Sequence, residues 1–74
     1  MLMKEQYAVM IGDDYITTIY KNSTSETRHF DDALKCDTID EAKLIMQLAI
    51  RRNSKTTKQF SIRKRVVTFE NVEL

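Results

Sequence analysis

Hydrophobic and polar positions follow a strand-like pattern at the beginning of the chain. Residues 5–11 (EQYAVMI) and 15–20 (YITTIY) are rich in β-branched and aromatic types, which favour extended structure. A Gly-Asp-Asp sequence at residues 12–14 separates them. Glycine readily adopts a positive φ, and aspartate hydrogen-bonds to nearby backbone, so a tight hairpin is expected there. The polar residues 21–27 (KNSTSET) that follow are typical of a mobile loop.

The middle of the chain changes to the spacing of an amphipathic helix. Hydrophobic side chains recur at three- and four-residue intervals over residues 39–50. Thr38 begins an S/T-x-x-E capping box, so the helix is expected to start directly after it. The hydrophobic stripe is broad, because Leu44 and Leu48 form a second edge beside it. We expect Leu44 or Leu48 to be covered from outside the monomer, which makes both candidates for self-association.

Strand-like alternation returns towards the end of the chain. Phe60 and Ile62 alternate with polar residues, and Val66 and Val67 continue the pattern after a change of side. That change predicts a bulge or bend near Val66 and Val67. A fourth short strand at the very end is left open. The order β-β-α-β predicts a single α+β domain over residues 1–74, in which one helix packs across a small antiparallel sheet.

Composition is that of a small soluble globular domain, with 42% hydrophobic and 31% charged residues. A core of this size is marginal, and a disulfide, a metal or a partner usually reinforces it. Cys36 is the only cysteine, so an internal disulfide is impossible. Cys36 and the only histidine, His29, cannot complete a four-ligand zinc site. We therefore expect no metal and no cofactor, whereas a partner or a homodimer stays open.

The sequence also bears on membranes and compartment. No hydrophobic run approaches the length of a membrane span. The N-terminal residues are interrupted by Lys4 and Glu5 and lack a small-residue cleavage pattern, so no signal peptide is expected. These features predict a cytoplasmic protein without a membrane partner.

Charge is distributed very unevenly along the chain. Residues 51–65 (RRNSKTTKQFSIRKR) hold seven of the twelve bases and no acid, whereas residues 1–50 hold nine acids against five bases. Such a block can produce a strong local field although the net charge is only +1. Its bases are the candidates for binding nucleic acid or an acidic partner: Arg51, Arg52, Lys55, Lys58, Arg63, Lys64 and Arg65.

Three interpretations of this basic segment stay open. Phosphate binding requires Lys and Arg on one surface, and RNA-binding sheets add exposed aromatic side chains for stacking. Phe60 is the only aromatic residue of the segment, and its alternation with Ile62 places it in the core. The other interpretations are a charged strand edge that discourages aggregation and a patch that docks on an acidic protein. Convergence of the bases on one open face would favour nucleic acid, and interleaving with acids would favour the other two.

No residue spacing typical of an active site occurs. His29 is expected at the surface, and Cys36 is expected to be buried as a small hydrophobic residue. A reactive thiol is the minor alternative, favoured by the nearby helix N-terminus. One glycine cannot form a glycine-rich phosphate loop. We therefore expect no enzymatic activity.

The order of segments resembles small uncharacterised proteins encoded by phages and prophages of low-GC Gram-positive bacteria. The strand pair EQYAVMI and YITTIY, the segment FDDALKCDTIDEAKLIMQLA and the ending ENVEL carry this resemblance. It implies an accessory protein of a mobile element that binds a host or phage protein. We therefore expect a small non-enzymatic binding or regulatory protein acting through protein–protein contact. The alternative is a nucleic-acid-binding accessory protein that uses residues 51–65.

Overall fold

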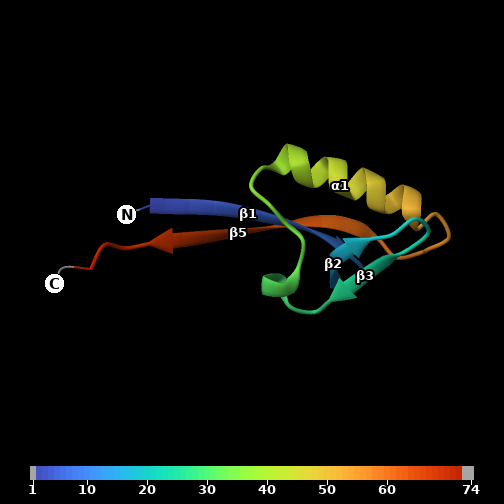
Figure 1. Ribbon diagram of the computed structural model, residues 1–74, viewed down its shortest axis with the longest axis horizontal. Helices are drawn as coiled ribbons and strands as arrows, with labels where there is room; N and C mark the ends of the chain where they lie inside the picture. Colours follow the sequence, from blue (N-terminus) through green and yellow to red (C-terminus); the bar gives the residue numbers. More distant parts are fainter. Residues whose placement is uncertain (1, 73–74) are drawn as a thin grey trace.

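In the computed structural model, which describes residues 2–72, one helix lies across one face of an antiparallel sheet (Figure 1). The expected α+β class, with strands before and after the helix, is confirmed. The elements are β1 (Leu2–Ile11), β2 (Asp14–Ile19), β3 (Thr24–Thr27), the 3₁₀ helix η1 (Phe30–Asp32), β4 (Lys35–Cys36), α1 (Ile39–Arg52) and β5 (Phe60–Phe69).

Strand β1 is the centre of the sheet. Along one edge it pairs with β5 over its whole length, from Leu2 opposite Phe69 to Ile11 opposite Phe60. Its other edge pairs with β4 near Tyr7 and with β2 at the hairpin, and β3 lies outside β2. Among the described residues, the outer edge of β5 and the first five residues of β1 therefore have unpaired backbone groups.

Local chemistry determines the hairpin and the start of the helix as expected. Ile11 pairs with Asp14 across a two-residue turn, in which Gly12 has a φ of 59°. A glycine at that position adopts positive φ without strain. At the helix start, the Thr38 hydroxyl accepts a hydrogen bond of 3.2 Å from the Glu41 N–H, which confirms Thr38 as the N-cap.

The core lies between α1 and the sheet. Val9, Ile11 and Ile16 are buried beneath the helix, where Ala42 and Ala49 have no exposed surface. Small side chains at these two helical positions let the helix approach the sheet closely. Phe60 and Ile62 of β5 pack against this cluster, as their alternation predicts.

A second, smaller cluster covers the opposite face of the sheet. Ala8, Tyr15 and Ala33 are buried there, and Phe30 of η1 packs against them. The rings of Tyr15 and Phe30 meet edge to face at 5.3 Å between centroids, a favourable aromatic geometry. This cluster holds the segment around η1 against the sheet.

The prediction of a loop over residues 21–27 is wrong in its second half. Residues Thr24–Thr27 form β3, which pairs with β2. Backbone pairing and contact with the neighbouring strand outweigh the weak strand preference of this polar sequence.

The predicted bulge at Val66 and Val67 is also wrong, because β1 and β5 keep an unbroken register. Along β5, the less exposed side chains switch from one face of the strand to the other because different elements cover the two faces. The helix covers Phe60 and Ile62, whereas Arg65 on the opposite face lies over Phe30. An irregularity in pairing does occur, but in β2 between Ile16 and Thr18.

Beyond β4, the paired strands β1 and β5 project as a two-stranded ribbon that ends where Leu2 pairs with Phe69 (Figure 1). We call this ribbon, residues 2–6 with 65–69, the arm. It makes the molecule elongated, with dimensions of 54 × 22 × 19 Å. No strand follows at residues 70–72, and the remainder of the expected terminal strand, Glu73 and Leu74, lies outside the described residues.

Candidate functional site

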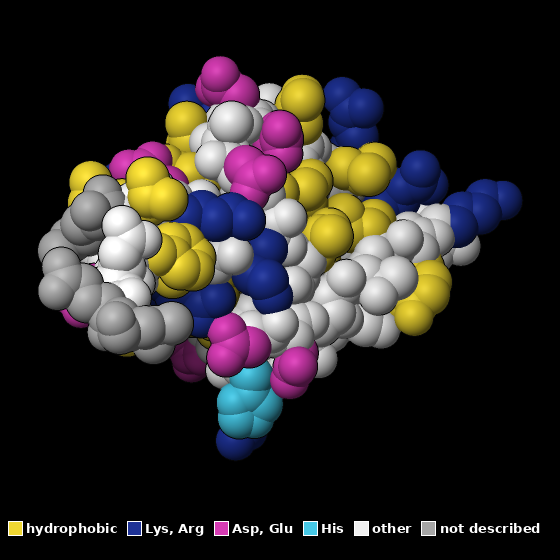
Figure 2. All heavy atoms as spheres, turned by 60° about the vertical axis from the view of Figure 1, so that its left-hand side comes forward, with side chains coloured by type: hydrophobic (Ala, Val, Ile, Leu, Met, Phe, Trp, Pro, Cys, Tyr) yellow, Lys and Arg dark blue, Asp and Glu magenta, His cyan; other side chains and the backbone are white. Residues whose placement is uncertain are grey.

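The bases of residues 51–65 do not converge on one face. In Figure 2, Lys and Arg side chains gather near the middle of the face shown, bordered by acidic and hydrophobic side chains, and others lie apart at its right-hand edge. One group lies at the end of α1 and in the following loop, and the second group points alternately to the two faces of β5. The first group is Arg51, Arg52, Lys55 and Lys58, and the second is Arg63, Lys64 and Arg65.

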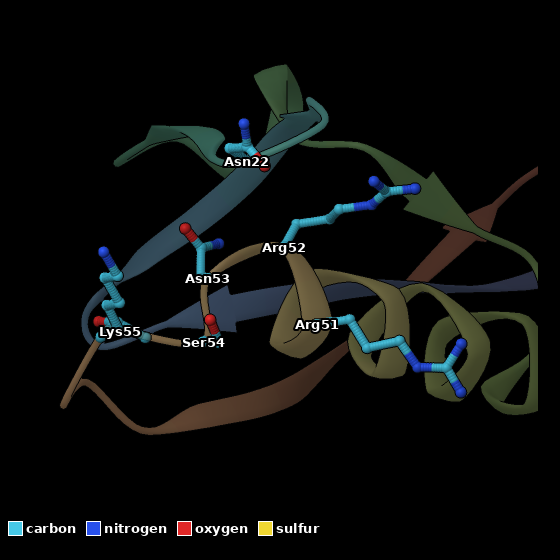
Figure 3. A pocket seen from close by; sticks show the side chains of 7 residues that line it. Asn22, Arg51, Arg52, Asn53, Ser54 and Lys55 are labelled. Atoms are coloured by element: carbon cyan, nitrogen blue, oxygen red, sulfur yellow. The ribbon is translucent and has the colours of Figure 1, made fainter.

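A hollow of about 410 Å³ lies at the C-terminal end of α1, and its lining contains no acid. Arg52 there donates a hydrogen bond of 3.1 Å to the Lys21 carbonyl, and Asn53 donates one of 2.9 Å to the Thr24 hydroxyl. In Figure 3, the charged ends of Arg51, Arg52 and Lys55 point in different directions. The three bases therefore do not surround a single anion. The lining residues are Asn22, Arg51, Arg52, Asn53, Ser54, Lys55 and Thr56.

Lys58 lies apart from this hollow and beside the hairpin turn. It lines a different depression together with Arg28 and the acidic residues Asp13 and Asp14. Its side chain lies next to Gly12, where an added Cβ would meet the Lys58 Cδ at 3.4 Å. Two bases and two acids therefore share this depression, and Lys58 is not part of an acid-free patch.

Arg65 is bound within the protein by three different groups. Its Nε and Nη2 donate to the Gln6 Oε1 at 3.2 and 2.7 Å, and its Nη1 donates to the Asp31 Oδ1 at 2.6 Å. The guanidinium carbon lies 4.4 Å from the centre of the Phe30 ring, within the range of a cation–π contact. The hydrogen bond from Arg65, followed by its charge, lowers the pKa of Asp31. These contacts join β5 to β1 and to η1, which is a structural role.

Arg63 and Lys64 also have partners within the fold. Arg63 donates to the Tyr15 hydroxyl at 3.3 Å. Lys64 Nζ lies 2.9 Å from the Glu5 Oε1, and the Tyr7 hydroxyl donates to the other carboxylate oxygen at 2.9 Å. The hydrogen bond from Lys64 is the main cause of the lowered pKa of Glu5, and the same bond raises the pKa of Lys64. Hydrogen bonding to Glu5 also raises the pKa of Tyr7.

The arm exposes hydrophobic side chains that no described part of the chain covers. Leu2 and Met3 are each 73% exposed, and Phe69 is 52% exposed although it lies directly opposite Leu2. Val66 is also half exposed. An isolated two-stranded ribbon is marginally stable in water, so this arrangement favours contact with another molecule. The sequence pattern did not indicate this surface, because it shows strand preference without showing where the sheet ends.

The helix residues proposed for self-association are exposed in the monomer. Leu44 is 66% exposed, and Leu48 is 39% exposed. No described part of the chain covers Leu44, which lies on the side of α1 opposite to Ala42 and Ala49. Their role in self-association stays a prediction.

The chemically reactive side chains are dispersed. His29 is exposed, and Cys36 is buried in the core beneath α1. Burial, followed by the charges of Glu41 and Asp37, raises the pKa of the Cys36 thiol and so disfavours the nucleophilic thiolate. Among residues 2–72, no three His, Cys, Asp or Glu side chains gather in a way that could hold a metal ion.

Comparisons with protein-family models, with curated proteins and with solved structures find no match to this chain. Within residues 2–72, the helical part is too short and too polar to cross a membrane. Function is therefore inferred from the chemistry of the exposed surfaces.

Proposed function

We propose that this protein is a small non-enzymatic binding or regulatory protein that acts through protein–protein contact, with the arm as its contact surface. The exposed hydrophobic side chains of the arm carry this proposal. The arm also offers unpaired backbone groups along β5 and along the start of β1. Hydrophobic side chains beside a free strand edge suit the addition of an extended segment from another protein.

The distribution of the bases supports the same proposal. Lys64 is paired with Glu5, and Arg65 is bound to Asp31 and Gln6. Breaking such contacts would oppose phosphate binding by these side chains, since each base would lose its present partner. Interleaved bases and acids are typical of a protein-binding or solvated surface.

The second candidate function is nucleic-acid binding at the end of α1. It is favoured by one observation, the hollow whose lining includes Arg51, Arg52 and Lys55 without an acid. Bases in the last helical turn also interact weakly and favourably with the helix dipole, so Arg51 and Arg52 do not require a ligand to account for their position. The spread of their charged ends ranks this function below protein contact (Figure 3).

A pull-down from the cells that encode this chain separates the two functions. The tagged protein is used with and without nuclease treatment of the lysate. One variant removes the hydrophobic arm surface through Val66→Ser and Phe69→Ser. Its matched control is Tyr20→Ser, because Tyr20 is also 52% exposed but lies outside the arm. Another variant replaces the helix-end bases Arg51, Arg52, Lys55 and Lys58 with Ala.

Protein contact predicts a partner that survives nuclease treatment and is lost only in the arm variant. Loss upon nuclease treatment and in the helix-end variant, with retention in the arm variant, would instead establish the second function. A cytoplasmic location and an origin in a phage or prophage stay predictions from the sequence.

A further inference from the structure

We propose that the partner of the arm is a second copy of this chain, whose β5 pairs antiparallel with β5 of the first copy about a two-fold axis at Val67. This inference rests on the proposed function, because it names the partner of the same surface. It uses the outer edge of β5, where ten residues pair with β1 alone among the described strands.

The second half of this edge lacks the usual protection against strand pairing. Natural edge strands are protected by proline, by bulges or by charged side chains. Strand β5 contains no proline, and its register with β1 has no irregularity. Its charged residues stop at Arg65, and the next four residues are Val, Val, Thr and Phe. Residues 66–69 are therefore a regular, uncharged segment open to another strand.

The charges flanking this segment favour antiparallel pairing with the same segment of a second copy. Bases precede residues 66–69, and Glu70 follows them. An antiparallel two-fold pairing brings the basic end of each strand beside the acidic end of the other. A parallel pairing would place like charges opposite each other, which destabilises a sheet. A two-fold interface must be complementary to itself, and this segment has that property.

Symmetry then specifies the pairs. A two-fold axis perpendicular to the sheet maps each face of the sheet onto the same face. Two residues that lie opposite each other therefore point their side chains to the same face. With the axis at Val67, each Lys64 lies opposite Glu70 of the second copy, and each Val66 lies opposite Thr68. Pairing with the second copy extends residues 70–72, which form no strand in the monomer, and brings Val72, 80% exposed, opposite Ile62. The two helices lie on the same face of one continuous sheet.

The free edge of β1 is a poorer candidate for the same pairing. It offers only residues 2–6 before β4 begins to pair at Tyr7. A two-fold axis at its middle residue would place Lys4 directly opposite Lys4 of the second copy. Pairing through β5 instead converts each two-stranded arm into part of a four-stranded sheet, and three or more strands are needed for independent stability.

Cysteine cross-linking tests this register in the full chain. Directly opposite residues in antiparallel strands have Cα atoms roughly 4.5–5.5 Å apart, within the range of a disulfide. The Val67→Cys variant should therefore form a covalent dimer upon mild oxidation. The matched control is Thr68→Cys, one position away, whose two thiols would lie on strands offset by roughly 7 Å along their length. The buried Cys36 remains in both variants, and the wild-type chain measures its background.

A charge reversal tests the same pairs without a cysteine. In the Glu70→Lys variant, two Lys–Lys oppositions replace two Lys–Glu pairs, so sedimentation should show a roughly tenfold weaker dimer. Adding Lys64→Glu restores the opposite charges between copies, and adding Glu5→Lys preserves the pairing of residues 5 and 64 within each chain. The triple variant should regain the dimer.

A concentration-dependent dimer, faster cross-linking through Val67→Cys than Thr68→Cys, and loss and rescue by the charge variants would support the proposal. A monomer at the highest concentration would overturn it, and so would a dimer that Glu70→Lys leaves unchanged. The proposed function survives such a failure if the Val66→Ser and Phe69→Ser variant still loses a different protein in the pull-down. If the arm variant alters neither self-association nor capture, both proposals fail.

Discussion

Replacement of Arg65 by Ala tests whether the bases of β5 are structural. The change removes two hydrogen bonds to Gln6, the contact with Asp31 and the stacking of the guanidinium on Phe30. These contacts hold β5, β1 and η1 together. We therefore expect Arg65→Ala to lower the free energy of unfolding by more than the loss of an exposed surface charge would.

The size of the loss follows from the individual contacts. Hydrogen bonding to Gln6 contributes a net of about 1 kcal/mol, and the cation–π contact contributes about 0.5–1 kcal/mol. The ion pair with Asp31 adds little, because that carboxylate is exposed and water screens it. A combined loss of about 2 kcal/mol should lower the thermal midpoint by roughly 10 °C in a domain of this size.

Thermal denaturation followed by circular dichroism measures this loss, with Arg51→Ala as the control. Arg51 is exposed, and its replacement should change the free energy of unfolding by less than about 0.5 kcal/mol. If Arg65→Ala lowers the midpoint no more than Arg51→Ala, Arg65 is not a structural residue. That result would remove the argument that Arg65 is occupied within the fold, and only the hydrophobic arm would then favour protein contact over nucleic-acid binding.

The comparison of wild type with Arg65→Ala also predicts a pH dependence of stability. The pKa of Asp31 is lowered in the folded state by Arg65. A carboxylate with a lowered folded pKa contributes stability that is complete above its unfolded value of 3.8 and is lost as pH falls through the folded value. The difference in midpoint between wild type and Arg65→Ala should therefore shrink in acid. A difference that grows in acid would contradict the assigned ion pair.

Three further predictions concern other parts of the chain. Thr38→Ala should cost about 1 kcal/mol in a thermal melt through loss of the N-cap, and an unchanged midpoint would contradict the observed helix start. The Cys36 thiol should react slowly with iodoacetamide at neutral pH until denaturant is added, because burial raises its pKa; equal rates would refute this. Mobility shifts should show only weak, sequence-independent nucleic-acid binding, with a smaller salt slope after alanine replacement of the helix-end bases. Tight, sequence-dependent binding would promote nucleic acid to the first function. The helix-end bases replaced in this experiment are Arg51, Arg52, Lys55 and Lys58.

The parts of the fold that depend on neighbouring residues could be predicted from the sequence. The turn at Gly12 depends on a backbone preference, and the helix start at Thr38 depends on a residue three positions away. Strand β3 was missed because its polar sequence becomes extended only through pairing with β2. The expected bulge at Val66 was wrong. Buried side chains can switch from one face of a strand to the other for two reasons: the register shifts, or different elements cover the two faces. A single sequence does not distinguish these causes.

The contacts that the bases of residues 51–65 make within the fold could not be predicted, because their partners are distant in sequence. Arg65 contacts Asp31, 34 positions away, and Gln6, 59 positions away. The charge pattern shows an excess of bases but does not show which carboxylates lie beside them. Likewise, the exposure of Leu2 and Phe69 results from the sheet ending at β4 on one side, which no local pattern encodes.

Hydrogen exchange of the β5 amides, measured by NMR at low and high protein concentration, tests the central claim that the β5 edge of the arm is the contact surface. Amides of residues 64–70 that point away from β1 exchange quickly in the monomer, since they have no partner on the open edge. Self-association through this edge predicts that their exchange slows as concentration rises, while the amides of α1 and of residues 53–58 are unaffected. Protection that appears in α1 or residues 53–58, with no change in residues 64–70, would contradict the claim.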